Sequence, residues 1–241
     1  MNMENYKIIE FNNPGIDWCG STQELFSKIT KLKIDGYQHE YGQNVMPMSS
    51  HDYFSSHIII CEEKDNDLFP LAISKVTKYS LCQYFNQPFP PIELVRKGGN
   101  EKLAVEIESI IKDTIDKYGE ITYDSSWTIR PDIRNTRANT IVIRMMLAEW
   151  INYHIDSALN DFLVSATLKV GTDKIFLTTG CEPISDDPYY QLIEVDNQKA
   201  MMLHCMHISD KMLYNASKYR SLWDNRIVIG EQVKVPVKQI V

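Results

Sequence analysis

The chain has 241 residues, of which 44% are hydrophobic and 24% are charged, and its formal net charge at pH 7 is −7. This composition is typical of an ordinary globular protein and excludes a disordered or fibrous chain. The negative net charge argues against nucleic acid as a partner, although a local cluster of arginines can still present a positive patch.

The cysteines indicate a reducing compartment. Five are present, an odd number without CxxC spacing, which argues against a disulfide framework or a zinc site: Cys19, Cys61, Cys82, Cys181 and Cys205. We find no apolar run long enough for a membrane span and no signal-peptide pattern at the N-terminus. The sequence therefore predicts a cytoplasmic protein with no metal centre.

The first half of the chain alternates strands and helices. Apolar periodicity and turn residues predict a strand over Tyr6–Phe11, a helix from Ser21 or Thr22 to about Ile34 closed by Asp35-Gly36, and an antiparallel hairpin of His57–Cys61 and Leu71–Val76. The segment Tyr84–Pro91 is predicted to be an aromatic and proline loop, and Glu101–Tyr118 a helix.

The second half starts with the most informative segment, Ile121–Ile151. It reads as an alternating strand over Ile121–Ile129, ended by Pro131, and then a long apolar helix that begins near Asn135 or Thr136. Further strands are predicted over Phe162–Leu168, Ile175–Thr179 and Gln198–Ile208, followed by a helix over Lys211–Trp223 and a strand-like tail. The pattern is that of an α/β or α+β protein.

Three arginines crowd the start of that long helix: Arg130, Arg134 and Arg137. Cations at a helix N-terminus oppose the helix dipole, and a bound phosphate-like anion relieves the conflict. The alternative is a solvated surface turn. No P-loop or dinucleotide glycine pattern is present, so chemistry on nucleoside triphosphates is not expected.

The element order resembles the acyltransferase fold of the GCN5-related N-acetyltransferase superfamily, and more narrowly the long-chain N-acyl amino acid synthases and acyl-homoserine-lactone synthases. The segments that carry the resemblance lie between residues 20 and 210: HDYFSSHIII from His51, YFNQPFP from Tyr84, ITYDSSWTIRPDIR from Ile121, GCEPISDDPYY from Gly180 and AMMLHCMHI from Ala200. The resemblance implies a mixed, mostly antiparallel sheet flanked by helices. It also implies a single domain over residues 1–210, with residues 211–241 forming a C-terminal helix and tail.

The function that the resemblance implies is transfer of an acyl group from a phosphopantetheine thioester, on acyl carrier protein or coenzyme A, to the amine of an amino acid or similar molecule. No permanently bound cofactor is implied. The donor-binding residues would be Ile129, Arg130, Arg134, Asn135, Thr136, Arg137 and Ala138. The catalytic candidates would be Tyr123, Asp124 and Ser125, and the acyl pocket would contain Phe85, Phe89, Trp127 and Met145, residues that are otherwise ordinary core.

The sequence also departs from the family pattern. Tyr123 stands where the family strand has a glutamate, Ser126 stands where it has an arginine, and Arg137 and Asn139 stand where glycines let the backbone close on a phosphate. A protein of this fold that has lost catalysis and binds an acyl ligand or a protein partner is therefore the alternative function.

Other groups of candidate residues are weaker indications of a functional site. His204 and His207 are metal-type residues, but on a strand they point to opposite faces. Cys181 has no neighbouring signature of a thiol nucleophile. His39-Glu40-Tyr41 is interpreted as a surface turn.

Overall fold

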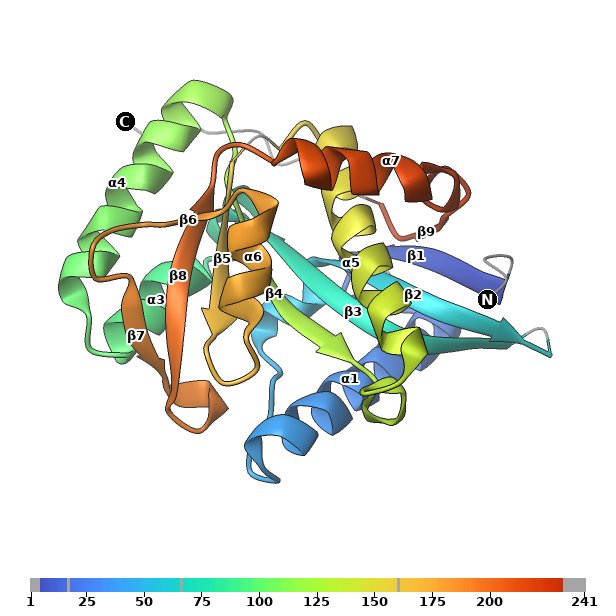
Figure 1. Ribbon diagram of the computed structural model, residues 1–241. Helices are drawn as coiled ribbons and strands as arrows, with labels where there is room; N and C mark the ends of the chain where they lie inside the picture. The colour runs from blue at the N-terminus through green and yellow to red at the C-terminus, as the bar shows by residue number, and fades with distance from the viewer. Residues whose placement is uncertain (1–4, 17, 66, 160, 232–241) are drawn as a thin grey trace.

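The computed structural model describes residues 5–231 except residues 17, 66 and 160. Its strands form one sheet in the order β6-β8-β5-β4-β3-β2-β1-β9, with β7 paired to β8 outside this path (Figure 1). The strands are β1 (Tyr6–Asn12), β2 (Ser56–Lys64), β3 (Asp67–Lys78), β4 (Thr122–Ile129), β5 (Phe162–Thr167), β6 (Glu182–Pro183), β7 (Tyr189–Leu192), β8 (Gln198–Cys205) and β9 (Ile227–Ile229). Neighbours are antiparallel except for the pairs β4–β5 and β1–β9.

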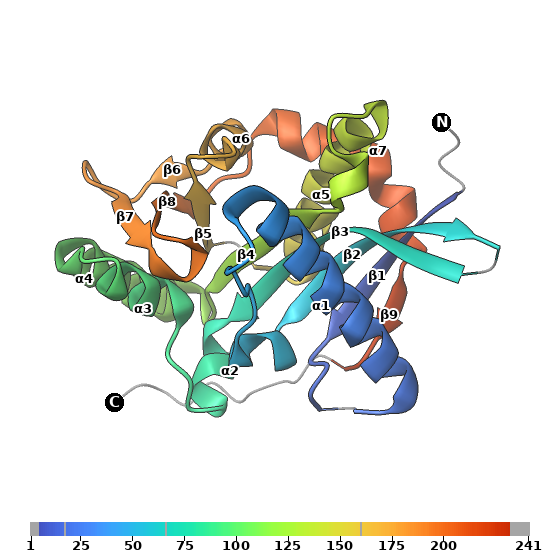
Figure 2. The same ribbon diagram turned by 90° about the horizontal axis from the view of Figure 1, so that it is seen from below.

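Helices cover both faces of the sheet (Figure 2). One face carries α1 (Gly20–Tyr41), α2 (Tyr79–Tyr84), α3 (Pro90–Lys97) and α4 (Glu101–Tyr118). The other carries α5 (Arg137–Asp156), α6 (Thr172–Thr179) and α7 (Asp210–Asp224). The predicted mixed, mostly antiparallel sheet flanked by helices is confirmed. No helix in the described part of the chain is long and apolar enough to cross a membrane.

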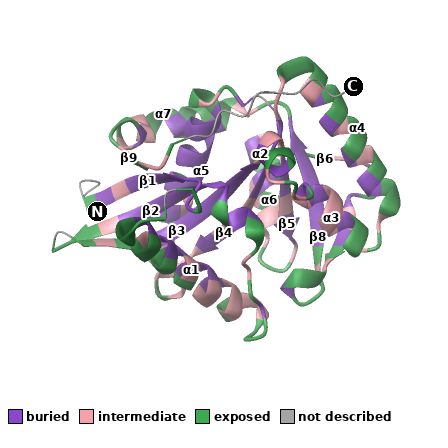
Figure 3. Ribbon diagram, turned by 180° about the vertical axis from the view of Figure 1, so that it is seen from behind, coloured by how far each residue is buried: buried purple, intermediate pink, exposed green. Residues whose placement is uncertain are grey.

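The sheet is buried between these two helical layers (Figure 3). On the α1 side, Phe26, Ile29 and Leu32 pack against alternate residues of β1, β2 and β3. On the α5 side, Val142 and Met145 pack against the intervening residues of the same strands. Because the strands have apolar residues on both faces, the central part of the sheet reads as nearly continuous hydrophobic runs.

The helix α1 runs to Tyr41, about two turns beyond the predicted end at about Ile34. A Cβ atom on Gly36 would lie 2.3 Å from Cγ2 of Thr128 in β4, so glycine is required for the close approach of the helix to the strand. The glycine is a packing residue and does not end the helix. Glu40 and Tyr41 consequently belong to the last helical turn, and their interpretation as a surface turn was wrong.

The strand predicted over Ile175–Thr179 is also wrong, because these residues form the second half of α6. Phe176 and Thr179 are buried while Leu177 is exposed, which is the spacing of a helix with one buried face. Gly171 and Gly180, both at positive φ, bound the helix. A short β-branched run has no periodicity that separates strand from helix.

The C-terminal segment completes the sheet and one helical layer. α7 packs against α5, and β9 pairs in parallel with β1. Arg226 donates to buried Glu10 at 2.6 Å. The strand-like tail is therefore represented by Ile227–Ile229, and residues 232–241 lie outside the described part.

Candidate functional site

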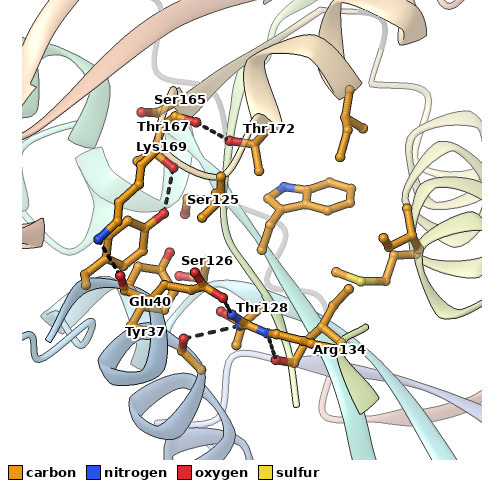
Figure 4. Close-up of a pocket in the computed structure, with 18 of the residues that line it drawn as sticks. Tyr37, Glu40, Ser125, Ser126, Thr128, Arg134, Ser165, Thr167, Lys169 and Thr172 are labelled. Atoms are coloured by element: carbon orange, nitrogen blue, oxygen red, sulfur yellow. Dashed lines mark hydrogen bonds and ion pairs between the residues drawn. The ribbon is translucent and has the colours of Figure 1, made fainter. Parts of the chain in front are cut away.

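The parallel strands β4 and β5 separate after a short paired region. They pair at Thr122–Phe162, Tyr123–Leu163 and Asp124–Val164 and at no later position. Beyond this point a cavity of about 510 Å³ opens between them (Figure 4). It is bounded by the last turns of α1, the N-terminal half of α5 and the start of α6. Backbone groups of β4 on this side have no neighbouring strand and are available to a ligand.

A β-bulge in β4 decides which side chains reach the cavity. Ser125 and Thr128 face Lys75 and Ile73 of β3, so two residues of β4, Ser126 and Trp127, lie opposite the single residue Ser74. Ser126 has φ 57°, in the left-handed region. The extra residue reverses the alternation of side chains along the strand. Regular alternation along the strand would place Trp127 on the same face as Tyr123. Because of the bulge, Trp127 instead points towards α5 and α6.

The cavity has two chemically different walls. The wall next to α1 is rich in hydroxyl groups, from Tyr37, Tyr41, Tyr123, Ser125, Ser165 and Thr167. The wall next to α5 and α6 is apolar and contains Trp127, Ile143, Met146, Leu147, Ile175 and Phe176. The Trp127 ring packs edge-on against Trp150 and Phe176 at 5.0 and 5.1 Å. Such a cavity suits a ligand with one polar and one apolar end.

The tyrosines of the polar wall are hydrogen-bond donors at neutral pH. Burial raises the pKa of Tyr37 and Tyr123 well above the usual value for tyrosine. Burial also raises the pKa of Tyr41, whose hydroxyl lies 2.7 Å from that of Thr167. These phenols stay protonated and can supply a proton or stabilise an oxyanion.

Charged groups gather at the α1 end of the cavity. Glu40 forms an ion pair with Arg134, which also donates to the carbonyl oxygens of Ile129 at 3.0 Å and Gly36 at 3.2 Å. Lys169 donates from Nζ to the backbone carbonyl of Glu40 at 2.6 Å. These bonds tie the end of α1 to the segment before α5 and to the loop after β5.

The predicted donor-binding residues divide into two groups. Ile129, Arg134 and Asn135 line the cavity, and Asn135 has φ 63°, a conformation that glycine adopts more readily. The remaining predicted residues, Arg130, Thr136, Arg137 and Ala138, lie outside the lining, at the start of α5. Arg134 is held by α1, so it is not the free cation that the arginine cluster suggested.

The anion site at the N-terminus of α5 stays a prediction. Its N-cap residue, Thr136, makes no side-chain cap. Arg130 pairs with Asp132 at 2.6 Å, and Arg137 is exposed. Uncapped N–H groups beside an exposed arginine attract a phosphate.

Asp124 does not face the cavity. It is fully buried and accepts hydrogen bonds from Trp150 Nε1 at 2.5 Å, His154 Nε2 at 2.6 Å and Thr122 Oγ1 at 3.2 Å. These bonds join β4 to α5. This placement contradicts the prediction that Asp124 is a catalytic residue, whereas Tyr123 and Ser125 do line the cavity.

The predicted acyl pocket is largely core. Phe85 stacks on Phe54, and Phe89 packs against Tyr79, both in the cluster beneath α2, α3 and α4. Met145 packs beneath β2 and β3. Of the four predicted residues only Trp127 lines the cavity.

The buried polar atoms without a hydrogen-bond partner among the described residues include three on cavity-lining residues: Trp127 Nε1, Thr128 Oγ1 and Asn139 Oδ1. Buried polar groups are nearly always satisfied in folded proteins. An unpaired donor and an unpaired acceptor at the walls of one cavity are compatible with a polar ligand there.

The metal-type residues do not form a centre. His204 bonds to Asp161, and no group of three or more His, Cys, Asp or Glu residues in the described part could hold a metal ion.

The sequence prediction missed the residues that α1, β5 and α6 bring to the site: Tyr37, Glu40, Tyr41, Ser165, Thr167, Lys169 and Phe176. A signal was present for α1, because Lys33, Tyr37 and Tyr41 follow the helical spacing of four that begins at Ile29. No comparable local signal identifies the others, since they meet only when β4 and β5 separate.

Comparison with solved structures gives the same arrangement of elements. A CoA-dependent acyl-homoserine lactone synthase, BjaI, solved with SAM and isopentyl-CoA, superimposes with a TM-score of 0.54 at 11% identity, covering 95% of each chain. The chain has the fold of the acyl-homoserine lactone synthases. TofI, in a ternary complex with an inhibitor and MTA, reaches a TM-score of 0.52 at 9% identity over 83% of this chain and 93% of its own.

A weaker match is FeeM, an N-acyl amino acid synthase from uncultured soil microbes, with a TM-score of 0.49 at 9% identity over 90% of this chain and 95% of its own. No family model matches the chain, and no curated protein matches it in sequence.

Proposed function

We propose that the protein transfers an acyl group from a phosphopantetheine thioester, carried by coenzyme A or acyl carrier protein, to the amine of an amino acid or a similar small molecule. The observation that carries this proposal is the cavity between the separated strands β4 and β5, which has one apolar wall and one wall of hydroxyl groups. The fold, shared with a CoA-dependent acyl-homoserine lactone synthase, supports it.

The donor fits the cavity on the side of α5 and α6. The amide-containing pantetheine arm is extended and can bond to the open edge of β4 as a further strand would. The free N–H of Trp127 suits a carbonyl oxygen of that arm, and the apolar wall beside it suits the acyl chain. A donor phosphate fits the uncapped N-terminus of α5 beside Arg137.

The chemistry needs few groups. The neutral amine attacks the thioester carbonyl, so a carbon–nitrogen bond forms while an electron pair moves to the oxygen, where N–H and phenol donors stabilise it. That pair then re-forms the carbonyl, and the carbon–sulfur bond breaks. One proton leaves the amine nitrogen and one proton reaches the thiolate. Protonated Tyr123 or Tyr37 can relay the proton between them. The products are an amide and a free thiol.

The acceptor fits the side of α1. Lys169 uses one N–H on the carbonyl of Glu40 and has further donors, which suit the carboxylate of an amino acid. The Lys169 ammonium group therefore favours an acceptor that carries an acidic group over a simple alkyl amine.

The proposal is tested with purified protein, acyl-CoA and acyl carrier protein bearing chains of several lengths, and a mixture of amino acids. Thiol release is followed with a thiol reagent, and products are identified by mass spectrometry. If the protein transfers the acyl group to an amine, we expect thiol and N-acyl product in equal amounts. Thermal stabilisation by a donor without any product would instead support the alternative function, an acyl-binding protein without catalysis.

A further inference from the structure

An amine acceptor needs a hydrogen-bond acceptor in the cavity that orients its nitrogen towards the thioester carbon. Anionic oxygens make the strongest such bonds. The tyrosines of the polar wall are protonated and prefer to donate, and Asp124 points away from the cavity. Among the described residues that line the cavity, Glu40 is the only one with a carboxyl group.

The surroundings of Glu40 leave part of its carboxylate available. The ion pair with Arg134 is formed through Oε1, and no bond to Oε2 is found within the described residues. A carboxylate has acceptor capacity for several hydrogen bonds. Figure 4 shows Glu40 reaching towards Arg134 at the α1 end of the cavity, close to Ser126 and Tyr37. The side chain is 28% exposed, so a small molecule can reach it.

Arg134 fixes the carboxylate in one position. Its guanidinium is held by the carbonyl oxygens of Ile129 and Gly36 as well as by Glu40, which leaves it little freedom to move. Lys169 donates a hydrogen bond to the backbone carbonyl of Glu40. A binding group locked by its neighbours in this way is preorganised for its ligand.

We propose that Glu40 is the residue that binds the acceptor amine, with Oε2 accepting a hydrogen bond from the amine nitrogen and Arg134 positioning the carboxylate. This inference rests on the proposed acyl transfer. It assigns the amine-binding role to α1, on the opposite side of the cavity from the apolar wall, and so fixes the direction from which the acceptor approaches.

The test compares Glu40→Gln with wild type in steady-state assays that vary the amine at saturating donor. We expect kcat/KM for the amine to fall about 10- to 100-fold, the range for loss of a hydrogen bond to a charged group, while the donor Kd stays within threefold. The matched control is Glu24→Gln, because Glu24 is also a paired carboxylate on α1 but lies outside the cavity.

Two further variants separate binding from structure. Arg134→Gln removes the same ion pair and keeps the carboxylate, so it should cost less in kcat/KM for the amine than Glu40→Gln. If Glu40→Gln fails to fold, Glu40→Asp keeps the charge but withdraws it by one methylene, and an intermediate loss is expected.

Equal losses in Glu40→Gln and Arg134→Gln, or an unchanged kcat/KM in Glu40→Gln, would overturn the inference. A wild-type protein without any transfer would instead overturn the proposed function, so the two failures are distinct.

Discussion

Replacing Gly36 by alanine tests whether the close packing of α1 on β4 shapes the site. In most helices this change stabilises by about 1 kcal/mol, because alanine has the higher helix propensity. Here the new Cβ would lie 2.3 Å from Thr128 Cγ2 and 3.2 Å from an Arg134 guanidinium nitrogen. Overpacking of this kind costs about 1–3 kcal/mol. Thr128 is short and β-branched, so it has few rotamers with which to move this methyl group away.

The expected result is therefore a loss of stability. After the gain of about 1 kcal/mol in helix propensity is subtracted, the net loss is up to about 2 kcal/mol. For a chain of this length about 1 kcal/mol corresponds to 2–4 °C in Tm, so Gly36→Ala should melt up to about 8 °C below wild type in a thermal unfolding assay. The control is Gly20→Ala in the first turn of the same helix, where a Cβ meets nothing within 4 Å. That variant should stay within about 0.5 kcal/mol of wild type.

A second substitution makes the test specific. Thr128→Ser removes the methyl group that the new Cβ would strike, so Gly36→Ala should be less harmful in the Thr128→Ser background, with a coupling of about 1 kcal/mol or more. Unchanged or raised stability in Gly36→Ala, or strictly additive effects in the double variant, would refute the packing argument.

Three further predictions concern the site and its support. Asp124→Leu leaves Trp150 Nε1 and His154 Nε2, which both donate to Asp124 Oδ2, without their buried acceptor and should lower the unfolding free energy by at least about 1–3 kcal/mol in urea, with donor binding retained; wild-type stability would contradict this. Trp127→Phe keeps a six-membered aromatic ring but removes the pyrrole ring with its free N–H, so donor KM should rise about two- to tenfold, and an unchanged KM would argue against this contact. Burial raises the pKa of Glu149 from 4.5 to about 8, so the folded state binds the proton more tightly and wild type should lose up to about 1.4 kcal/mol per pH unit between those values. Glu149→Gln cannot ionise and should show a shallower decline in urea unfolding from pH 5 to pH 8; an equal decline would disprove the assignment.

Local patterns predicted most of the fold. The alternation in Ile121–Ile129 and the N-cap at Thr136 correspond closely to β4 and α5. The helix Glu101–Tyr118 matches α4 at both ends, because Asn100 caps its start and Gly119 adopts a left-handed conformation at its end. Each of these signals lies within a few residues of the element that it defines.

The sequence predictions failed where contacts between residues far apart in the chain determine the local structure. Gly36 looks like a helix terminator until β4 is seen to lie against it. The bulge at Ser126 turns Trp127 to the other face, and no residue in the strand signals this. Glu40 and Lys169 are far apart in sequence and meet only because α1 crosses the sheet beside the end of β5. The site depends on such contacts, so its residues were predicted less well than the elements that carry them.

We propose that acyl transfer takes place in the cavity between β4 and β5, and blocking that cavity is the most direct test. Ser125→Trp places an indole where Ser125 now lines the space, and Lys112→Trp adds the same group on the exposed surface of α4. Amide formation is measured for both variants beside wild type, with circular dichroism to verify folding. We expect folded Ser125→Trp to form no amide and Lys112→Trp to match wild type. Wild-type amide formation by folded Ser125→Trp would contradict it.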